Sequence, residues 1–259
     1  PSGRVGFCHS EEEIIMYHFF VEPHQIGAEE IRIEGADVNH IRNVLRMKPG
    51  EEILISSREG GDYFCRVEEL EPEYVSAKIL EEWENKELPA RIHLFQGLPK
   101  GDKMELIIQK AVELGAYRVV PVSMKRSVVK LDAKKADAKR KRWNAVSESA
   151  AKQSKRSLIP EVAPLMTYKE AVKEAAGYDM VLLPYESADG IRKTRELLAS
   201  VKPGTDIAVF IGPEGGFEDE EVELARENGA EIVTLGKRIL RTETAGLCML
   251  SALMLQLEV

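Results

Sequence analysis

Three segments in the second half of the chain have residue types and spacing that suit ligand binding. They are Leu183-Pro184, the glycine-rich run 211–216 (IGPEGG) and the run 235–241 (LGKRILR), and each follows an apolar stretch typical of a buried strand. Glycines at such ends let the backbone come close to a ligand. We predict a binding site lined by Leu183, Pro184, Ile211, Gly212, Pro213, Gly215, Gly216, Leu235, Gly236, Ile239, Leu240 and Thr244.

The glycine-rich run at 211–216 does not have the pattern of a phosphate-binding loop. No Gly-Lys-Ser/Thr follows it, and its glycines lack the spacing of a dinucleotide-binding fingerprint. The next helix is expected to open with four acidic residues, 218–221, which already occupy the positive end of its dipole. The run therefore favours a ligand that is uncharged or cationic at this point, and an ordinary strand-to-helix turn is the alternative.

Arg241 and Glu243, at the end of the third segment, are the candidate catalytic residues. A guanidinium can stabilise negative charge that develops on a substrate. A carboxylate two residues further on can orient that guanidinium or accept a proton. No histidine lies in these loops, so a histidine base is not expected. The alternative is a structural ion pair between Glu243 and Arg241 at the start of a helix.

The elements that must position these loops alternate between strands and helices from residue 91 onward. Strands are expected at 91–97, 117–122, 178–184, 206–212 and 230–236, and helices at about 102–114 (capped by Asp102), 132–153, 190–200 and 218–228. This alternation predicts a mostly parallel sheet covered on both faces, with ligands beyond the carboxyl ends of its strands. The last helix, from about Thr242, is apolar nearly all round, which indicates burial by internal packing or by a partner subunit.

Residues 16–86 have a different, β-rich pattern. Short strands are expected at 19–21, 31–33, 51–57, 63–70 and about 75–79, with a hairpin turn at 59–62. They predict a small barrel or sandwich, joined through the polar stretch 81–89 to a second domain at 90–259. Residues 1–15, before Met16, match no signal peptide and are expected to be an extension outside the fold.

Charge is distributed unevenly along the chain. The net charge is −8, yet residues 124–160 contain twelve Lys or Arg against three acidic residues, a local net of +9. Such a stretch is typical either of a phosphate-facing surface or of a solvated helix face. The three cysteines and five histidines are scattered, which argues against a metal site and suits a reducing cytoplasm. The longest apolar run, 245–255, is too short for a membrane span.

Six segments together carry a family resemblance. They are MYHFFVEP (16–23), HIRNVLRMKPGEEI (40–53), QGLPKGDKMELIIQKAVELGA (96–116), SESAAKQSKR (147–156), IGPEGGF (211–217) and LGKRILRTETA (235–245). They resemble the ribosomal RNA uridine N3-methyltransferase family (RsmE-like) of the SPOUT superfamily, over nearly the whole chain from Met16. The last two segments are specific when they occur together in this order. Two departures are Lys152 and Lys155, where the family commonly has an acidic residue and a glycine.

The resemblance implies a fold and an activity. The fold is an N-terminal PUA-like β-barrel for RNA docking and a C-terminal SPOUT α/β domain with a trefoil knot, which pattern alone would not predict because knots are nearly absent from proteins. The cofactor is S-adenosylmethionine, whose sulfonium and lack of phosphate suit the 211–216 run. The reaction is methylation of N3 of a uridine in 16S (small-subunit) ribosomal RNA, without a metal. The partners are that RNA, or the assembled small subunit, and a second copy of the chain at the knot and last helix.

Basic residues outside the three loops are the candidate RNA contacts. They are Arg42 and Arg46, which flank a short helical turn, and Lys100, Lys103, Lys125, Arg126 and Arg156. Contacts of this kind to phosphates would position RNA without specifying its sequence. Two other functions are weighed against the methyltransferase. One is a non-catalytic RNA-binding or ribosome-assembly protein, and the other is a Rossmann-type nucleotide enzyme, which the missing phosphate fingerprint disfavours.

Overall fold

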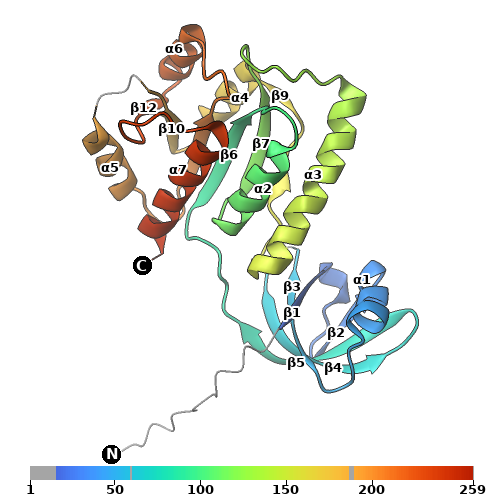
Figure 1. Cartoon of the computed structure of the whole chain (residues 1–259). Helices are drawn as coiled ribbons and strands as arrows, with labels where there is room; N and C mark the ends of the chain where they lie inside the picture. Colours follow the sequence, from blue (N-terminus) through green and yellow to red (C-terminus); the bar gives the residue numbers. More distant parts are fainter. Residues whose placement is uncertain (1–15, 59, 187–189, 259) are drawn as a thin grey trace, which may run out of the picture. The chain divides into compact units, whose positions relative to one another are not determined.

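The computed structural model describes residues 16–58, 60–186 and 190–258, so the expected extension at 1–15 lies outside the described residues. The chain divides into two compact units, Pro1–Trp83 and Glu84–Val259, whose elements are labelled in Figure 1. The polar stretch expected to join two domains at 81–89 begins too early, because strand β5 (Tyr74–Trp83) continues to Trp83. The last residues of β5, 81–83, remain in the strand despite the polar Glu81 and Glu82, because they pair with β4.

The first unit is a curled five-stranded sheet in the order β1-β3-β4-β5-β2. Its other strands are β1 (Tyr17–Val21), β2 (Glu30–Glu34), β3 (Glu52–Ser57) and β4 (Asp62–Leu70). Register shifts between β4 and β5 mark bulges, which bend a strand. Gly60 and Gly61 turn the β3–β4 hairpin with φ of +116° and +95°, as predicted, while Glu59 lies outside the described residues. Alternate apolar residues such as Ile31, Ile53 and Val75 form its core.

Short helical segments complete the first unit. They are η1 (Pro23–Gln25), α1 (Ala36–Asn39) and the π-helical η2 (His40–Leu45). Arg46 ends η2 with φ of +55°, a conformation that residues other than glycine rarely adopt. Such backbone features cluster at functional sites, so this turn is a candidate binding element.

The second unit contains a sheet in which every strand pair is parallel, in the order β12-β10-β11-β6-β7-β8, with β9 beside β7. Its strands are β6 (Arg91–Gly97), β7 (Arg118–Ser123), β8 (Glu161–Val162), β9 (Met166–Thr167), β10 (Met180–Pro184), β11 (Asp206–Ile211) and β12 (Glu231–Val233). The predicted parallel sheet is confirmed. Strand β12 ends at Val233, three residues before the predicted end, so residues 234–236 are free to form a loop.

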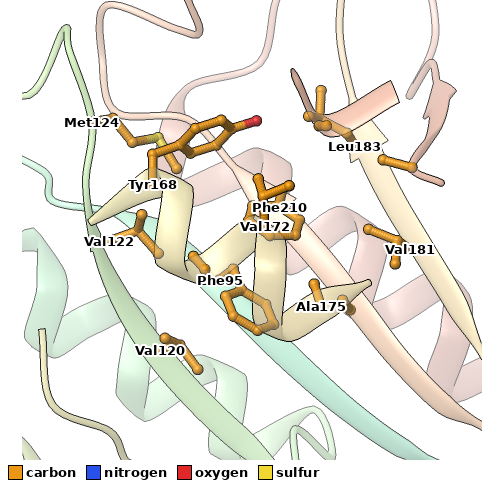
Figure 2. Close-up of a cluster of buried hydrophobic side chains, with 14 of the residues drawn as sticks. Phe95, Val120, Val122, Met124, Tyr168, Val172, Ala175, Val181, Leu183 and Phe210 are labelled. Atoms are coloured by element: carbon orange, nitrogen blue, oxygen red, sulfur yellow. The ribbon is translucent and has the colours of Figure 1, made fainter. Parts of the chain in front are cut away.

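Helices cover both faces of this sheet, as predicted (Figure 1). They are α2 (Lys103–Glu113), α3 (Ala133–Ser154), α4 (Tyr168–Ala175), α5 (Ile191–Ala199), α6 (Asp219–Glu227) and α7 (Thr242–Leu257). On one face, α4 places Tyr168 and Val172 over Phe95 and Phe210, whose rings stack at 4.7 Å (Figure 2). On the other face, Gly246 of α7 lies against the strands β6 and β11. No helix of the described ranges is long and apolar enough to span a membrane.

The helix ends follow from local chemistry. Asp132 caps α3 by accepting a hydrogen bond from the backbone N–H of Lys135 at 2.8 Å. Asp102 stands at the N-cap of α2, but its side chain makes no capping hydrogen bond. Lys155 ends α3 with φ of +55°, which explains physically why a glycine suits this position. Helix α4 was not predicted, although Thr167 and Glu170 form a capping box at its start.

Helix α7 is only partly covered by its own chain. Gly246, Met249, Leu250 and Leu253 are buried on one face, whereas Leu255 is 72% exposed. The prediction of burial on all sides is therefore wrong for a single chain. The exposed apolar side chains of α7 therefore leave open the alternative that a partner subunit covers them.

Candidate functional site

The carboxyl ends of three neighbouring strands, β12, β10 and β11, open into one pocket of about 480 Å³. The sheet order brings together loops that are separated in sequence, as the sequence analysis expected of parallel strands. The predicted site residues that line this pocket are Pro184, Ile211, Gly212, Pro213, Gly215, Gly216, Leu235, Gly236, Ile239, Leu240 and Arg241. Leu183 is buried in β10, and Thr244 and Glu243 are absent from the lining.

Sequence reasoning missed several residues of the lining. They are Tyr185, Glu186, Glu214, Phe217, Thr234, Arg238, Thr242 and Ala245, and the lining also includes Lys103 and Arg126, which were expected at an RNA surface. Most of them adjoin the predicted loops, so a wider window around each strand end would have found them. Lys103 comes from α2, more than a hundred residues before the loops it meets, and no local signal identifies it.

Glycines have two different roles in the pocket wall. Gly216 and Gly236 have φ of +70° and +116°, and a Cβ built on either one would have no neighbour within 4 Å. They form turns and leave open space where a side chain would otherwise stand. Gly215 is required by packing instead, since its Cβ would lie 2.8 Å from the Cβ of Arg126. A substitution at Gly215 would therefore disturb packing as well as the pocket.

A buried hydrogen-bond chain connects the pocket floor to α7. The side-chain amide of Gln96, at the end of β6, donates to Thr242 Oγ1 at 2.9 Å, and Thr242 Oγ1 donates to the carbonyl oxygen of Gly212 at 2.6 Å. Gln96 is fully buried, and its Oε1 has no hydrogen-bond partner within the described structure. These hydrogen bonds fix the start of α7 against the glycine-rich run, and no local pattern indicates them because the three residues are far apart in sequence.

Ion pairs neutralise two cations of the pocket wall. Lys103 Nζ lies 3.1 Å from Glu214 and 3.3 Å from Glu243, and the hydrogen bond to Glu214 contributes most to raising the pKa of Lys103. For Glu214, burial raises the pKa, but backbone hydrogen bonds and Lys103 outweigh it and lower the pKa overall. Arg126 donates to Glu218 at 2.9 Å and to the Gly215 carbonyl oxygen at 2.9 Å. These pairs hold the glycine-rich run in place.

Helix α6 begins with its own acidic residues, as predicted. Glu218 is the N-cap and forms a capping box with Glu221, and Asp219 and Glu220 lie in the first turn. Lys125 pairs with Glu220. The helix terminus is therefore already satisfied by carboxylates, which leaves little electrostatic advantage for a phosphate.

The two candidate catalytic residues are in different environments. Arg241 lines the pocket as the exposed N-cap residue of α7, and within the described ranges its guanidinium has no ion-pair partner. Glu243 pairs with Lys103, so the alternative of a structural Arg241–Glu243 ion pair is wrong. Arg241 is thus free to act on a ligand, while the Glu243 carboxylate is already engaged.

The other predicted RNA contacts are divided between the two units. Arg42 lies in η2 and Arg46 at its end in the first unit, and Lys100 is exposed in the second. The prediction for Arg156 is corrected, because this side chain is buried. Its guanidinium donates to Glu87 and to the carbonyl oxygens of Val112 and Ala116, which leaves none of it for a phosphate.

Comparisons with known proteins bear on what this pocket is for. Residues 86–254 match the family described as RNA methyltransferase domain, and residues 33–80 match the RNA methyltransferase PUA domain. The ribosomal RNA small subunit methyltransferase E of Bacillus subtilis (strain 168) is 39% identical over 251 residues, which are 94% of this chain and 98% of that protein. The chain belongs to this methyltransferase family. The membership predicted from the six segments is confirmed.

Two solved structures of methyltransferases are similar over most of their length. A ribosomal RNA small subunit methyltransferase E from Neisseria gonorrhoeae, bound to S-adenosyl methionine, has 34% identity and a TM-score of 0.77, covering 92% of this chain and 96% of that one. A methyltransferase from Legionella pneumophila in complex with the same cofactor has 30% identity and a TM-score of 0.79, with the same coverage. The family member described here is thus an α/β methyltransferase with a PUA-like N-terminal domain, as predicted.

The pocket of this methyltransferase fits S-adenosylmethionine on its own features. Its volume lies in the range typical of sites for small cofactors. Gly216 and Gly236 leave open space at the wall, and Ile211, Leu235 and Leu240 supply apolar surface. The carboxylates at the start of α6 disfavour a phosphate and tolerate a cation such as the sulfonium.

Proposed function

We propose that this chain transfers the methyl group of S-adenosylmethionine to N3 of a uridine in 16S (small-subunit) ribosomal RNA. The observation that carries the proposal is the meeting of three loops at the carboxyl ends of β10, β11 and β12 in one pocket, with the unpaired Arg241 at its wall. Membership of the methyltransferase family supplies the reaction class, and the family's uridine N3 activity supplies the target atom.

The cofactor is held by the loops that line the pocket. The residues proposed to hold it are Pro184, Ile211, Gly212, Pro213, Gly215, Gly216, Leu235, Gly236 and Leu240. When bound, it would supply an electrophilic methyl group, which a nitrogen would attack in line while S-adenosylhomocysteine leaves as the neutral thioether. Leu183 supports the wall from inside β10, and Thr244 is exposed and does not line the pocket, although Thr242 and Ala245 on either side of it do.

Arg241 is the proposed catalytic residue. Before it can attack the methyl group, uracil N3 must release its proton to solvent, and the negative charge of the resulting anion spreads onto the ring carbonyl oxygens. A guanidinium aimed at these oxygens stabilises that charge most where it is not already neutralised, which is the state of Arg241. Glu243 has a positioning role, because its ion pair with Lys103 holds the first turn of α7 in place. Holding base and cofactor in line supplies a further part of the rate.

The two units divide the work in this proposal. The first unit, which ends at Trp83, docks RNA, with Arg42 and Arg46 on phosphates, and the second unit, which begins at Glu84, binds the cofactor and transfers the methyl group. The loops around the pocket form the trefoil knot of the SPOUT superfamily. The apolar surface of α7 that is exposed in the single chain, including Leu255, packs against a second copy in a homodimer. We place the protein in the cytoplasm together with its ribosomal RNA.

The decisive experiment is nucleoside mapping of small-subunit RNA. Purified protein, labelled cofactor and either free RNA or small subunits from cells lacking the enzyme are incubated, and one 3-methyluridine is expected. Binding of S-adenosylmethionine without any methyl transfer to either substrate would favour a non-catalytic role in subunit assembly. Light scattering on the purified protein alone is expected to give the mass of two chains.

A further inference from the structure

Cations around the pocket are of two kinds, and the difference is informative. Lys103 and Arg126 are neutralised by glutamates, as described above. At the rim formed by the 235–241 loop, Lys237 and Arg238 are exposed, and neither has an ion-pair partner within the part of the chain that the structure describes. A cation that is already paired must give up its partner to bind a phosphate, whereas these two need not.

Ile239 adds an apolar contact at the same place. Its side chain is 84% exposed, although it lines the pocket. Gly236, with φ of +116°, turns the chain just before Lys237, and the three side chains at 237–239 are exposed. Arg238 and Ile239 line the pocket, and Lys237 directly precedes them. A single exposed isoleucine is ordinary on a protein surface. Together with the two unpaired cations beside it, Ile239 forms a surface that combines charge and apolar contact, as nucleotide-binding surfaces do.

We propose that Lys237 and Arg238 bind the phosphates that flank the target nucleotide, and that Ile239 packs against a neighbouring base. This inference rests on the proposed function. A base that is modified inside a pocket must leave its stack, and its backbone phosphates then stay at the pocket rim. Single-stranded RNA is held by cations along its backbone together with surfaces on which bases rest. The 237–239 segment has both and lies at that rim.

The inference revises the RNA surface expected from sequence. Lys125 and Arg126 are the basic pair nearest to the glycine-rich run, but Glu220 and Glu218 neutralise them. Their net contribution to an RNA-attracting field is therefore small. The 237–239 segment carries two charges that nothing near it in the described structure cancels.

The test compares two charge-removing variants. Lys237→Ala with Arg238→Ala is compared with Lys125→Ala, which removes an exposed cation that is ion-paired. Affinity for purified small-subunit RNA is measured against salt concentration, and affinity for S-adenosylmethionine by calorimetry. The double variant is expected to reduce the salt slope by about 1.4, from roughly 0.7 per lost phosphate contact on a single strand, and to weaken RNA binding about tenfold or more at low salt. Lys125→Ala should change the slope by less than half of that amount.

Ile239→Ala separates the apolar contact from the charges. It is expected to weaken RNA binding severalfold with an unchanged salt slope, while cofactor affinity stays at the wild-type value in the two charge-removing variants. A double variant with the wild-type salt slope, or one that loses cofactor affinity instead, would overturn the inference. The binding measurement needs no turnover. If wild-type protein fails to methylate the RNA but the slopes differ as expected, the proposed function fails and the RNA contact stands.

Discussion

The two edges of the parallel sheet both carry charged clusters, but only one of them has the properties of a site. At the amino edge, Arg91 donates to Asp206 at 2.7 Å, His93 lies 3.1 Å from the same carboxylate, and its ring contacts Tyr178 at 4.5 Å. Asp206 thus has two partners, both fixed by the neighbouring strand β6. At the carboxyl edge, glycine turns leave open space and Arg241 is unpaired.

The difference shows that a cluster of charges does not by itself identify a functional site. The amino-edge charges are paired with one another, and the Arg91–Asp206 ion pair and the His93–Asp206 contact fasten β6 to β11. The carboxyl-edge loops are held by their own ion pairs and hydrogen bonds, and some of their cations remain available. Four predictions test this contrast, from the largest expected effect to the smallest.

Replacing the unpaired guanidinium of Arg241 should cause the largest loss of methyl-transfer rate. Arg241→Ala is expected to lower the single-turnover methyl-transfer rate about a hundredfold or more, as for loss of an oxyanion-stabilising donor, while RNA and cofactor affinities remain. Arg91→Ala removes an equivalent charge from the amino edge and should leave the rate within about twofold of wild type. Equal rates for the two variants at saturating substrates would mean that Arg241 takes no part in the reaction.

Alanine variants of two glycines that both need a positive φ distinguish loss of stability from loss of cofactor binding. Gly236 and Gly204 have φ of +116° and +82°, with no atom within 4 Å of a built Cβ, and Gly204 lies just before β11 at the amino edge. Alanine at either position should cost about 1–3 kcal/mol of stability through backbone strain. Only Gly236→Ala should also weaken S-adenosylmethionine binding, by about tenfold, measured by calorimetry. The cofactor lies elsewhere if both variants bind it like wild type.

The buried hydroxyl under the pocket should matter for stability. Thr242→Val keeps the shape of the side chain but leaves the Gln96 amide and the Gly212 carbonyl without their bonds, at a cost of about 1–3 kcal/mol. Thr205→Val at the amino edge removes a hydroxyl that is bonded to the Lys202 carbonyl oxygen in a more accessible turn. Water can replace that bond, so its unfolding free energy should change by less. A denaturant titration of both variants measures the contrast.

The smallest effect is a pH dependence at the amino edge. Burial lowers the pKa of His93 below its ordinary value of 6.5, against the opposing effect of Asp206. As the pH falls, His93 of the unfolded chain therefore takes up its proton before His93 of the folded chain. The folded state keeps its full stability above pH 6.5 and loses part of it as the pH falls below that value. His93→Gln should show a smaller fall in melting temperature between pH 7.5 and 5.5 than wild type. A larger fall would mean that the folded state favours charged His93.

Local sequence was enough for most of the longer elements and for the loops, but not for β8, β9 and α4. The apolar runs predicted the strands β6, β7, β10 and β11, because a strand buried on both faces must be apolar along its length. The four acids at 218–221 and the glycines of 211–216 located the helix start and the turn, since dipole and φ requirements act within a few residues. Short motifs in a fixed order were also enough to indicate the family.

Only the tertiary structure decided which side chains meet. The order β12-β10-β11 brings three loops into one pocket, and Lys103 reaches Glu214 and Glu243 from a helix far away in sequence. Arg156, one of many basic residues in its stretch, is instead buried against Glu87. Hydrophobic periodicity reports which face of an element is buried, but it carries no information about the element that covers it. The partners of each charge, and so its availability to a ligand, are fixed by contacts between residues that are distant in the chain.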